Sequence, residues 1–420
     1  MPSARGTRIG TLPILCGIAA AMVLTSSCES DRTLAPTVES GGRRVGDPVP
    51  GRLIVRARDA AGFEAYARAA GIEIEASIPR QRVFAVRLDA SDGDGPSLAS
   101  LVSSSSVQSV ASDSWVHVNS RVEMEYDADL TEEDFGNTWA FNKIKRLAAL
   151  AYATGDGVIV GVLDTGVKSS LSCFSGKLVP GWDFVGNDSI PEETANTVNE
   201  DADSKTDEGA GHGTLMAGLI VYVAPDAQVL PCRIFDDEGW GTLFECAAAV
   251  EWAVDHGADV LSLSASSVMD STVLEDALDY ATSEGVLLVC AAGNDDTDDS
   301  YYPAAYADAF GVGGSNTQDL ITWDSNYGAG NVDILAPGID VSGPWWLGGF
   351  AWADGTSPAA AITAAVAALY LELDPGATPA EVADALRDGS DAVTPTNPPF
   401  SAGDWGAGRL NAEGTVLLAP

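Results

Sequence analysis

Three residue types that can together break a peptide bond stand in separate glycine-containing motifs of this 420-residue chain. Asp164 ends the apolar run GVIVGVLD and opens the turn DTG, His212 stands in GAGHGT, and Ser357 stands in DGTSPA. A serine hydroxyl becomes nucleophilic when a histidine takes its proton, and a carboxylate can hold that histidine in the required tautomer. The three motifs therefore favour hydrolysis through an acyl-enzyme.

Each residue also has a simpler interpretation. Asp-Thr-Gly is good turn chemistry, a lone histidine is usually a hydrogen-bonded core residue, and serine commonly caps a helix. The DTG turn also resembles half of an aspartic peptidase site, but that chemistry needs two carboxylates, and the sequence contains one such turn. The joint occurrence of all three motifs favours the serine mechanism, whereas structural roles are expected for His117 and His256.

The elements around these motifs predict a doubly wound α/β domain. Residues 157–164, 227–235, 258–266 and 285–293 are continuous apolar runs, as in strands buried on both faces of a parallel sheet. Helical patterns at 242–257 and 272–285 alternate with them, so we expect a mostly parallel sheet with helices on both faces. Polar residues that end these strands would lie at its carboxyl edge, where such folds bind ligands.

The segment that begins at Ser357 is apolar almost all round. It is short for a membrane span and carries Thr363 and Glu372, so a buried central helix is expected. Ser357 would then lie at the positive end of the helix dipole, which helps to stabilise an oxyanion, and Pro358 is tolerated in a first turn.

Composition divides the chain into five parts. Residues 1–28 predict a signal peptide, since Arg5 and Arg8 precede an apolar stretch that is followed by TSSC. Residues 29–48 predict a flexible tether, 49–120 a small α+β domain with the order β-α-β-α-β, 121–137 an acidic connector, and 138–420 the large α/β domain. The chain is therefore expected to leave a bacterial cell, either secreted or held in the envelope by a lipid on Cys28.

The net charge restricts the molecules that the chain is expected to bind. The chain has 61 acidic against 22 basic residues, a net charge of −39, which disfavours binding to nucleic acid or anionic lipid.

Outside the predicted signal peptide, the four cysteines Cys173, Cys232, Cys246 and Cys290 allow three disulfide connectivities. Cys232 and Cys290 lie in apolar runs, where an inert buried thiol is the simplest expectation.

The motifs together closely resemble the subtilase (subtilisin-like) serine peptidases. VLDTGV, GHGTLMAG and GTSPAAA resemble the three catalytic motifs of that family, in its order, and the resemblance covers about residues 138–417. It implies Asp164, His212 and Ser357 as a triad in a serine endopeptidase without a catalytic cofactor. The small domain before it resembles the propeptide of the family, which implies a self-processed zymogen whose propeptide acts as an intramolecular inhibitor, with polypeptide substrates.

The resemblance also assigns binding residues. The segment LLVCAAGNDD makes Asn294 the side-chain donor of an oxyanion hole. The implied substrate-binding residues are Gly239, Trp240, Gly241, Ser264, Ala265, Ser266, Ala292, Gly293 and Tyr301. Tyr301 replaces a usual Gly or Ser, so we expect a shallow pocket that disfavours large aromatic residues. Pro358 and Ala361 replace the usual Met and Pro of the serine motif, so an inactive binding protein on the same scaffold is the alternative.

Calcium is the expected structural cofactor. Carboxylates gather just before His212, and oxygen-rich clusters suit Ca²⁺. The candidate ligands are Asp183, Asp188, Asp201 and Asp203. A solvated acidic loop is the alternative explanation in so acidic a chain.

Overall fold

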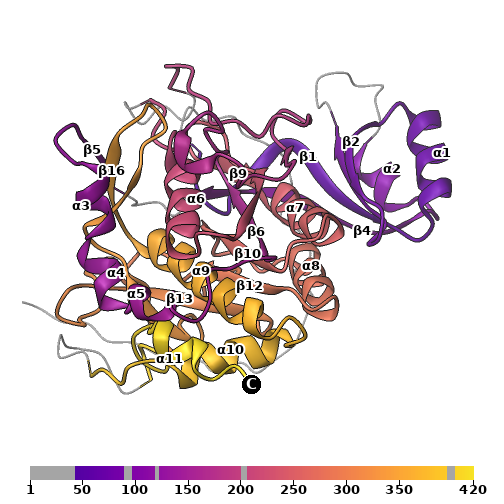
Figure 1. Cartoon of the computed structure of the whole chain (residues 1–420). Helices are drawn as coiled ribbons and strands as arrows, with labels where there is room; N and C mark the ends of the chain where they lie inside the picture. The colour runs from indigo at the N-terminus through magenta and orange to yellow at the C-terminus, as the bar shows by residue number, and fades with distance from the viewer. Residues whose placement is uncertain (1–42, 89–96, 119–122, 200–205, 395–402) are drawn as a thin grey trace, which may run out of the picture. The chain divides into compact units, whose positions relative to one another are not determined.

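The computed structural model describes residues 43–420 except 89–96, 119–122, 200–205 and 395–402 (Figure 1). These residues belong to one unit, which begins at Glu39. The predicted signal peptide, Cys28 and most of the predicted tether lie outside the described residues, as do Asp201 and Asp203.

A seven-stranded sheet forms the centre of the large α/β part. All of its neighbouring strands are parallel, and most of its residues are buried, as expected from the continuous apolar runs. Its order is β14 (Ile334–Pro337), β13 (Ala309–Ser315), β12 (Leu287–Ala291), β10 (Val260–Leu263), β6 (Ile159–Asp164), β8 (Gln228–Arg233) and β7 (Trp182–Asp183). The predicted doubly wound parallel sheet is confirmed.

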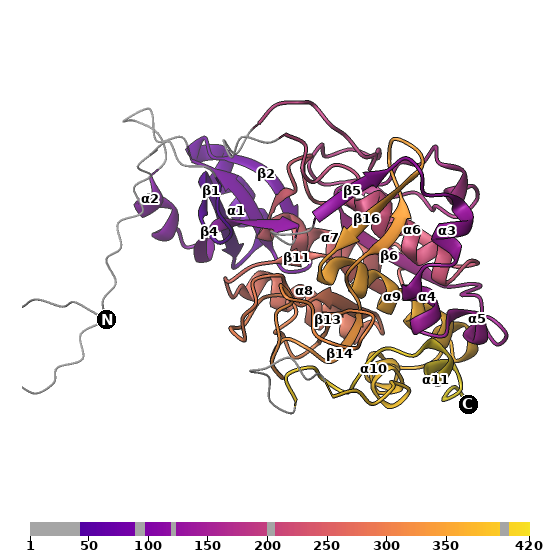
Figure 2. The same cartoon turned by 90° about the vertical axis from the view of Figure 1, so that its left-hand side faces the viewer.

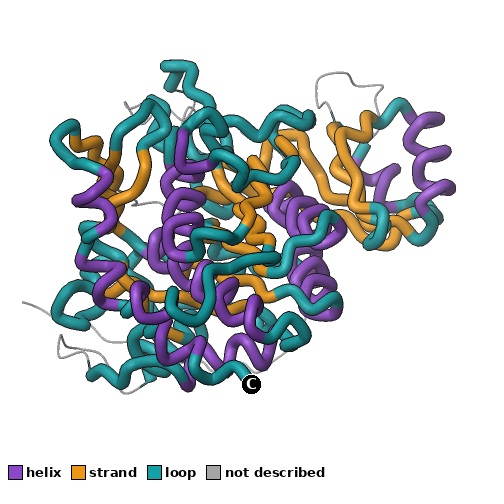
Figure 3. The backbone as a smooth tube through the Cα atoms, in the orientation of Figure 1, coloured by secondary structure: helices purple, strands orange, loops and turns teal. Residues whose placement is uncertain are grey.

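Helices cover both faces of this sheet and form two separate hydrophobic clusters (Figures 1 and 3). One cluster contains α6 (His212–Val223), α9 (Thr356–Leu373), α10 (Pro379–Asp388) and α11 (Ala412–Val416). The other contains α7 (Leu243–Asp255) and α8 (Thr272–Ser283). Among the described helices, α9 alone is long and apolar enough to cross a membrane. It is buried from Thr356 to Leu371, which confirms the predicted core helix.

The small N-terminal domain is an antiparallel sheet with two helices. Its elements are β1 (Pro48–Ala57), α1 (Ala60–Ala70), β2 (Glu73–Ile78), β3 (Val83–Arg87), α2 (Leu98–Val102) and β4 (Val107–Val118), and the strand order is β4-β1-β3-β2. The strand β2 was not expected between the first helix and the second predicted strand. Its sequence EIEASI is mostly half-exposed and begins with glutamates, so it lacks the apolar pattern of its neighbours.

The acidic connector contains two regular elements, β5 (Glu123–Asp127) and α3 (Glu132–Gly136), and α4 (Trp139–Lys143) and α5 (Arg146–Ala149) follow. β5 pairs antiparallel with β16 (Phe350–Asp354), and β16 pairs with β15 (Val341–Pro344). Figure 2 shows β5 and β16 side by side. Because β16 runs through Gly355 into α9, this small sheet adjoins the segment that carries Ser357.

The four described cysteines are unpaired thiols. Cys173 is exposed, and Cys232, Cys246 and Cys290 are buried. Partial burial raises the pKa of Cys173 to about 11. Burial also raises the pKa of the other three thiols, so all four are poor nucleophiles at neutral pH.

Candidate active site

Asp164 and His212 are hydrogen-bonded in the interior of the α/β part. Asp164 is the last residue of β6, His212 is the first residue of α6, and their side chains are 2% and 1% exposed. His212 Nδ1 lies 2.7 Å from Asp164 Oδ1, and the same oxygen accepts from the backbone N–H of Thr165 at 2.7 Å. The carboxylate is thus fixed, and it favours the ring tautomer with its proton on Nδ1.

Two glycines let the start of α6 approach this turn. Gly211 has φ 97°, in the left-handed region, and a Cβ on it would lie 2.4 Å from a ring carbon of Trp346. A Cβ on Gly213 would lie 2.2 Å from the carbonyl oxygen of Gly166. Gly213 also donates its N–H to Thr165 Oγ1 at 2.9 Å. Glycine is therefore required on both sides of His212 to seat its ring against Asp164.

Ser357 and Asn294 lie at the start of α9. Ser357 is the second residue of that helix and is fully buried. Asn294 Oδ1 accepts from Thr356 N at 2.8 Å and from Thr356 Oγ1 at 2.9 Å, next to the serine. Because the side-chain oxygen is used in this way, the amide nitrogen is directed away from Thr356. Pro358 lies in the first turn, where no backbone N–H has an intrahelical partner, so α9 accommodates it.

Two buried nitrogen atoms of this site have no hydrogen-bond partner among the described residues. They are Nε2 of His212 and Nδ2 of Asn294. The imidazole is therefore not hydrogen-bonded to the serine hydroxyl here, a separation that is common before substrate binds. Buried polar atoms are rarely left unpaired, and functional sites are where exceptions concentrate. These two atoms are the ones that a proton transfer and an oxyanion would use.

Two short strands of the α/β part pair with the end of the small domain. They are β9 (Trp240–Thr242) and β11 (Ala265–Ser266), and both are antiparallel to β4. His117 stands opposite Trp240 on one side and Ser266 on the other. The N–H of Val118 donates to the carbonyl of Gly239 at 2.9 Å. The segments expected to bind substrate thus hold the last residues of β4 as a middle strand.

The other residues expected at the substrate site lie near Asn294. Ala292 is fully buried, and Gly293 has φ 104°. A Cβ on Gly293 would lie 3.2 Å from Cδ1 of Tyr301, so the tyrosine ring lies close to this backbone. Ser264 is buried directly before β11. His117 and His256 make contacts away from Asp164: His117 Nε2 lies 3.0 Å from the carbonyl of Glu238, and His256 Nδ1 lies 2.7 Å from the carbonyl of Trp252.

Glu193 is a residue near the site that the sequence did not reveal. It is buried and accepts from Thr214 N at 3.1 Å and Thr214 Oγ1 at 2.8 Å, in the first turn of α6. Burial raises the pKa of Glu193 to about 7, and hydrogen bonds oppose that rise. It was missed because it stands in a long acidic loop, where the sequence does not distinguish a buried carboxylate from solvated ones.

The described calcium candidates do not fit a cation site. Asp183 Oδ2 pairs with Arg233 at 2.9 Å, and Oδ1 of Asp183 accepts two backbone N–H groups. Asp188 Oδ1 accepts from the N–H of Ile190 at 2.8 Å. Among the residues that the structure describes, no group of three His, Cys, Asp or Glu side chains could hold a metal ion. Asp183 is therefore a structural ion-pair residue rather than a calcium ligand.

The sequence of the chain is similar to those of known proteins. Residues 155–406 match the model of the subtilase family. Thermitase from Thermoactinomyces vulgaris is 33% identical over 280 residues, which are 64% of this chain and 92% of thermitase. M-protease from Shouchella clausii (strain KSM-K16) is 33% identical over 301 residues, 69% of this chain and 72% of that protein.

A solved structure shows the same fold. Fervidolysin from Fervidobacterium pennivorans, a keratinolytic enzyme related to subtilisin, matches with a TM-score of 0.71 and 22% sequence identity. The match covers 92% of this chain and 64% of fervidolysin, so this chain spans about two thirds of that protein's length.

Proposed function

The chain belongs to the subtilase family of serine endopeptidases, and we propose that Asp164, His212 and Ser357 are its catalytic triad. The 2.7 Å contact between Asp164 and His212 carries this proposal, because it fixes a buried imidazole with Nε2 as the proton acceptor. Ser357 Oγ then attacks the scissile carbonyl while Nε2 takes its proton. His212 passes that proton to the leaving amine, and water hydrolyses the acyl-enzyme.

Asn294 supplies the oxyanion hole in this mechanism, together with the backbone N–H of Ser357. Asn294→Ala is expected to lower kcat by about 10²–10³-fold, a magnitude taken from the oxyanion asparagine of subtilisin. Steady-state kinetics on a peptide substrate would measure it. Asn294→Asp retains the oxygen that accepts from Thr356 and loses the donor, so it should lose at least as much. The control is Asn316→Ala, which removes the side chain of a turn residue. Unchanged kcat in both Asn294 variants would contradict the assignment.

We propose that the small domain is an inhibitory propeptide that the enzyme removes itself. The pairing of β4 with β9 and β11 supports this, since the strand lies where an extended substrate would add to two edges. The cut would fall between Val118, the last residue of β4, and Glu123, the first residue of β5. β5 would then become the N-terminal element of the mature enzyme.

A buried charge cluster joins the two parts beside β4. Arg52 of β1 pairs with Asp113 of β4 at 3.0 Å, with Glu75 of β2 at 2.8 Å and with Glu245 of α7. Asp113 is fully buried, and its Oδ1 accepts from the N–H of Phe244 at 3.2 Å. Burial, with Glu245 nearby, raises the pKa of Asp113 to about 7 although Arg52 opposes the rise.

The cleaved propeptide is expected to bind less tightly as pH rises. The free propeptide lacks the contacts that α7 makes through Phe244 and Glu245, so the pKa of Asp113 is expected to fall there from about 7 toward its ordinary value of 3.8. Protonation of Asp113 then favours the docked state below pH 4, and this contribution is lost as the pH rises through 7. Affinity should fall by up to about tenfold per pH unit over that window. Inhibition of the mature enzyme by its separated propeptide, titrated from roughly pH 5 to roughly pH 8, measures this loss of affinity. Asp113→Asn should flatten the slope, whereas Asp47→Asn, on the exposed surface, should not.

Tyr301 is proposed to make the main specificity pocket shallow. Its ring lies close to the backbone of Gly293, next to the proposed oxyanion donor. Tyr301→Gly is expected to raise kcat/KM for substrates with Phe before the cut bond, relative to Ala, by about tenfold. A peptide library would measure the ratio. A wild-type preference for Phe or Tyr at this position would refute the shallow pocket.

The location of the enzyme is proposed from the sequence. We propose export from a bacterial cell, with residues 1–28 as the signal segment and Cys28 as a lipid anchor of the uncut precursor. Polypeptides are the proposed substrates.

A further inference from the structure

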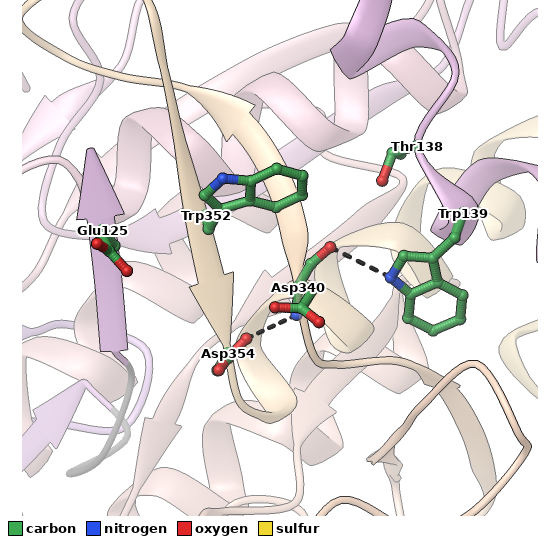
Figure 4. Close-up of a pocket in the computed structure, with 6 residues that line it drawn as sticks. All are labelled: Glu125, Thr138, Trp139, Asp340, Trp352 and Asp354. Atoms are coloured by element: carbon green, nitrogen blue, oxygen red, sulfur yellow. Dashed lines mark hydrogen bonds between the residues drawn. The ribbon is translucent and has the colours of Figure 1, made fainter. Parts of the chain in front are cut away.

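A cavity lies beside β16, the strand that leads to Ser357. Its volume is about 490 Å³, and it is lined by Glu125, Thr138, Trp139, Asp340, Trp352 and Asp354 (Figure 4). These residues come from β5, from the start of α4, from the turn before β15 and from β16. None of them is a triad, oxyanion or substrate-strand residue. We call this space the tryptophan–carboxylate cavity.

The lining combines negative charge with two aromatic rings. Three of the six described lining side chains are carboxylates, and none of these six is Lys, Arg or His. Trp139 Nε1 donates to the carbonyls of Ile339 at 3.1 Å and Asp340 at 3.2 Å. Trp352 Nε1 donates to Asp127 Oδ2 at 3.1 Å. Because both indole N–H groups are engaged, the rings offer π surface to a ligand, and π surface attracts cations.

Thr138 provides an independent sign that a ligand is expected. The residue is 6% exposed, and its Oγ1 is buried without a hydrogen-bond partner among the described residues. It precedes α4 but makes no side-chain cap to that helix. Figure 4 shows the hydroxyl pointing toward the space between Trp352 and Trp139. Such orphaned buried atoms are rare, and a polar ligand in the cavity would satisfy this one.

The dimensions favour an organic cation over a metal ion. No three carboxylates of the described residues are grouped closely enough to hold a metal ion. A cavity of about 490 Å³ also falls in the size range of small-molecule sites. Guanidinium and ammonium groups stack on indoles and pair with carboxylates. We propose that the tryptophan–carboxylate cavity binds an organic cation, a guanidinium or primary ammonium at the end of an aliphatic chain.

Binding there would link two strands with separate roles. Glu125 of β5 stands opposite Trp352 of β16 in the antiparallel pair. Asp354 Oδ1 accepts from the N–H of Asp340 at 2.7 Å, so β16 is also tied to the turn before β15. A bound cation would therefore hold β5 against β16. It would stabilise the folded state by a free energy that grows with the logarithm of one plus the ligand concentration divided by Kd.

The test measures binding rather than activity, in the Ser357→Ala chain, so its result does not depend on the proposed catalytic function. Calorimetric titration uses agmatine as a free small molecule and N-acetyl-arginine amide as a peptide-like ligand. N-acetyl-citrulline amide, which has the same shape without the charge, is the control ligand. Saturable binding of either guanidinium compound, without binding of the citrulline compound, supports the proposal. Which of the two binds more tightly distinguishes a free cation from a peptide side chain.

Three variants locate the site. Trp352→Leu is expected to raise Kd about tenfold through loss of the cation–π contact. Glu125→Gln, a milder change at an exposed position, is expected to raise Kd up to about fivefold. Glu133→Gln, on α3 outside the cavity, should leave Kd unchanged. The proposal is overturned by absence of saturable binding, by equal binding of the citrulline compound, or by an equal effect of Glu133→Gln. Displacement of both guanidinium ligands by stoichiometric Ca²⁺ would also overturn it.

Discussion

Ser357→Ala is expected to abolish turnover and leave the small domain attached. Ser357 is the proposed nucleophile, so its removal should lower kcat by about 10⁶-fold, the magnitude measured in subtilisin, a member of the same family. Alanine suits the first turn of a buried helix and removes one oxygen, so the fold should persist. Intact-mass measurement of the purified proteins tests the second half of the prediction. Wild type should lose the chain up to a point between Val118 and Glu123, and the variant should remain uncut.

The same pair of proteins separates an enzyme from an inactive scaffold. A fluorophosphonate probe should label wild type at Ser357 and leave the variant unlabelled, because the probe needs an activated serine. Thermal unfolding of both proteins checks that they are folded. Shedding of the small domain by purified Ser357→Ala at the wild-type rate would show that another residue or another protease makes the cut. An unlabelled wild type would support the binding-protein alternative.

The central sheet could be predicted because the sequence of each of its strands reflects how that strand is buried. The runs that became β6, β8, β10 and β12 are apolar at nearly every position, which only strands covered on both faces need to be. The three catalytic motifs were recognisable for a related reason. Each couples its reactive residue to glycines that a close approach requires, as Gly211 and Gly213 show around His212.

The elements that escaped prediction depend on partners far away in the chain. β5 has the acidic sequence EMEYD and is a strand because it pairs with β16, more than 200 residues later. Asp183 looked like a cation ligand within its acidic loop, but Arg233, 50 residues away in sequence, neutralises it. The tryptophan–carboxylate cavity likewise draws its lining from segments that only the fold brings together. The composition of a short segment does not indicate contacts with segments far away in the chain.

Asp164→Asn is expected to lower kcat by about 10⁴-fold with little change in KM. The carboxylate accepts from Nδ1 of His212 at 2.7 Å and holds the tautomer in which Nε2 can take the serine proton. Asn has nearly the same shape, but its amide can donate to Nδ1 and so stabilise the opposite tautomer, with the proton on Nε2. The expected magnitude is that of the same change in chymotrypsin-type peptidases. Steady-state kinetics on a peptide substrate separates kcat from KM.

A control at the other end of the same strand distinguishes this tautomer effect from general damage to β6. Asp259 Oδ2 accepts from the N–H of Ile159, the first residue of β6, at 2.8 Å. Asp259→Asn removes a partly buried charge there without touching the imidazole, so it should change thermal stability modestly and leave kcat near the wild-type value. If Asp164→Asn and Asp259→Asn lowered kcat equally, the loss would come from the strand. If only Asp164→Asn did so, it would come from the carboxylate that orients His212, because both substitutions replace an Asp by Asn at an end of β6, Asp164 within the strand and Asp259 in contact with its first residue.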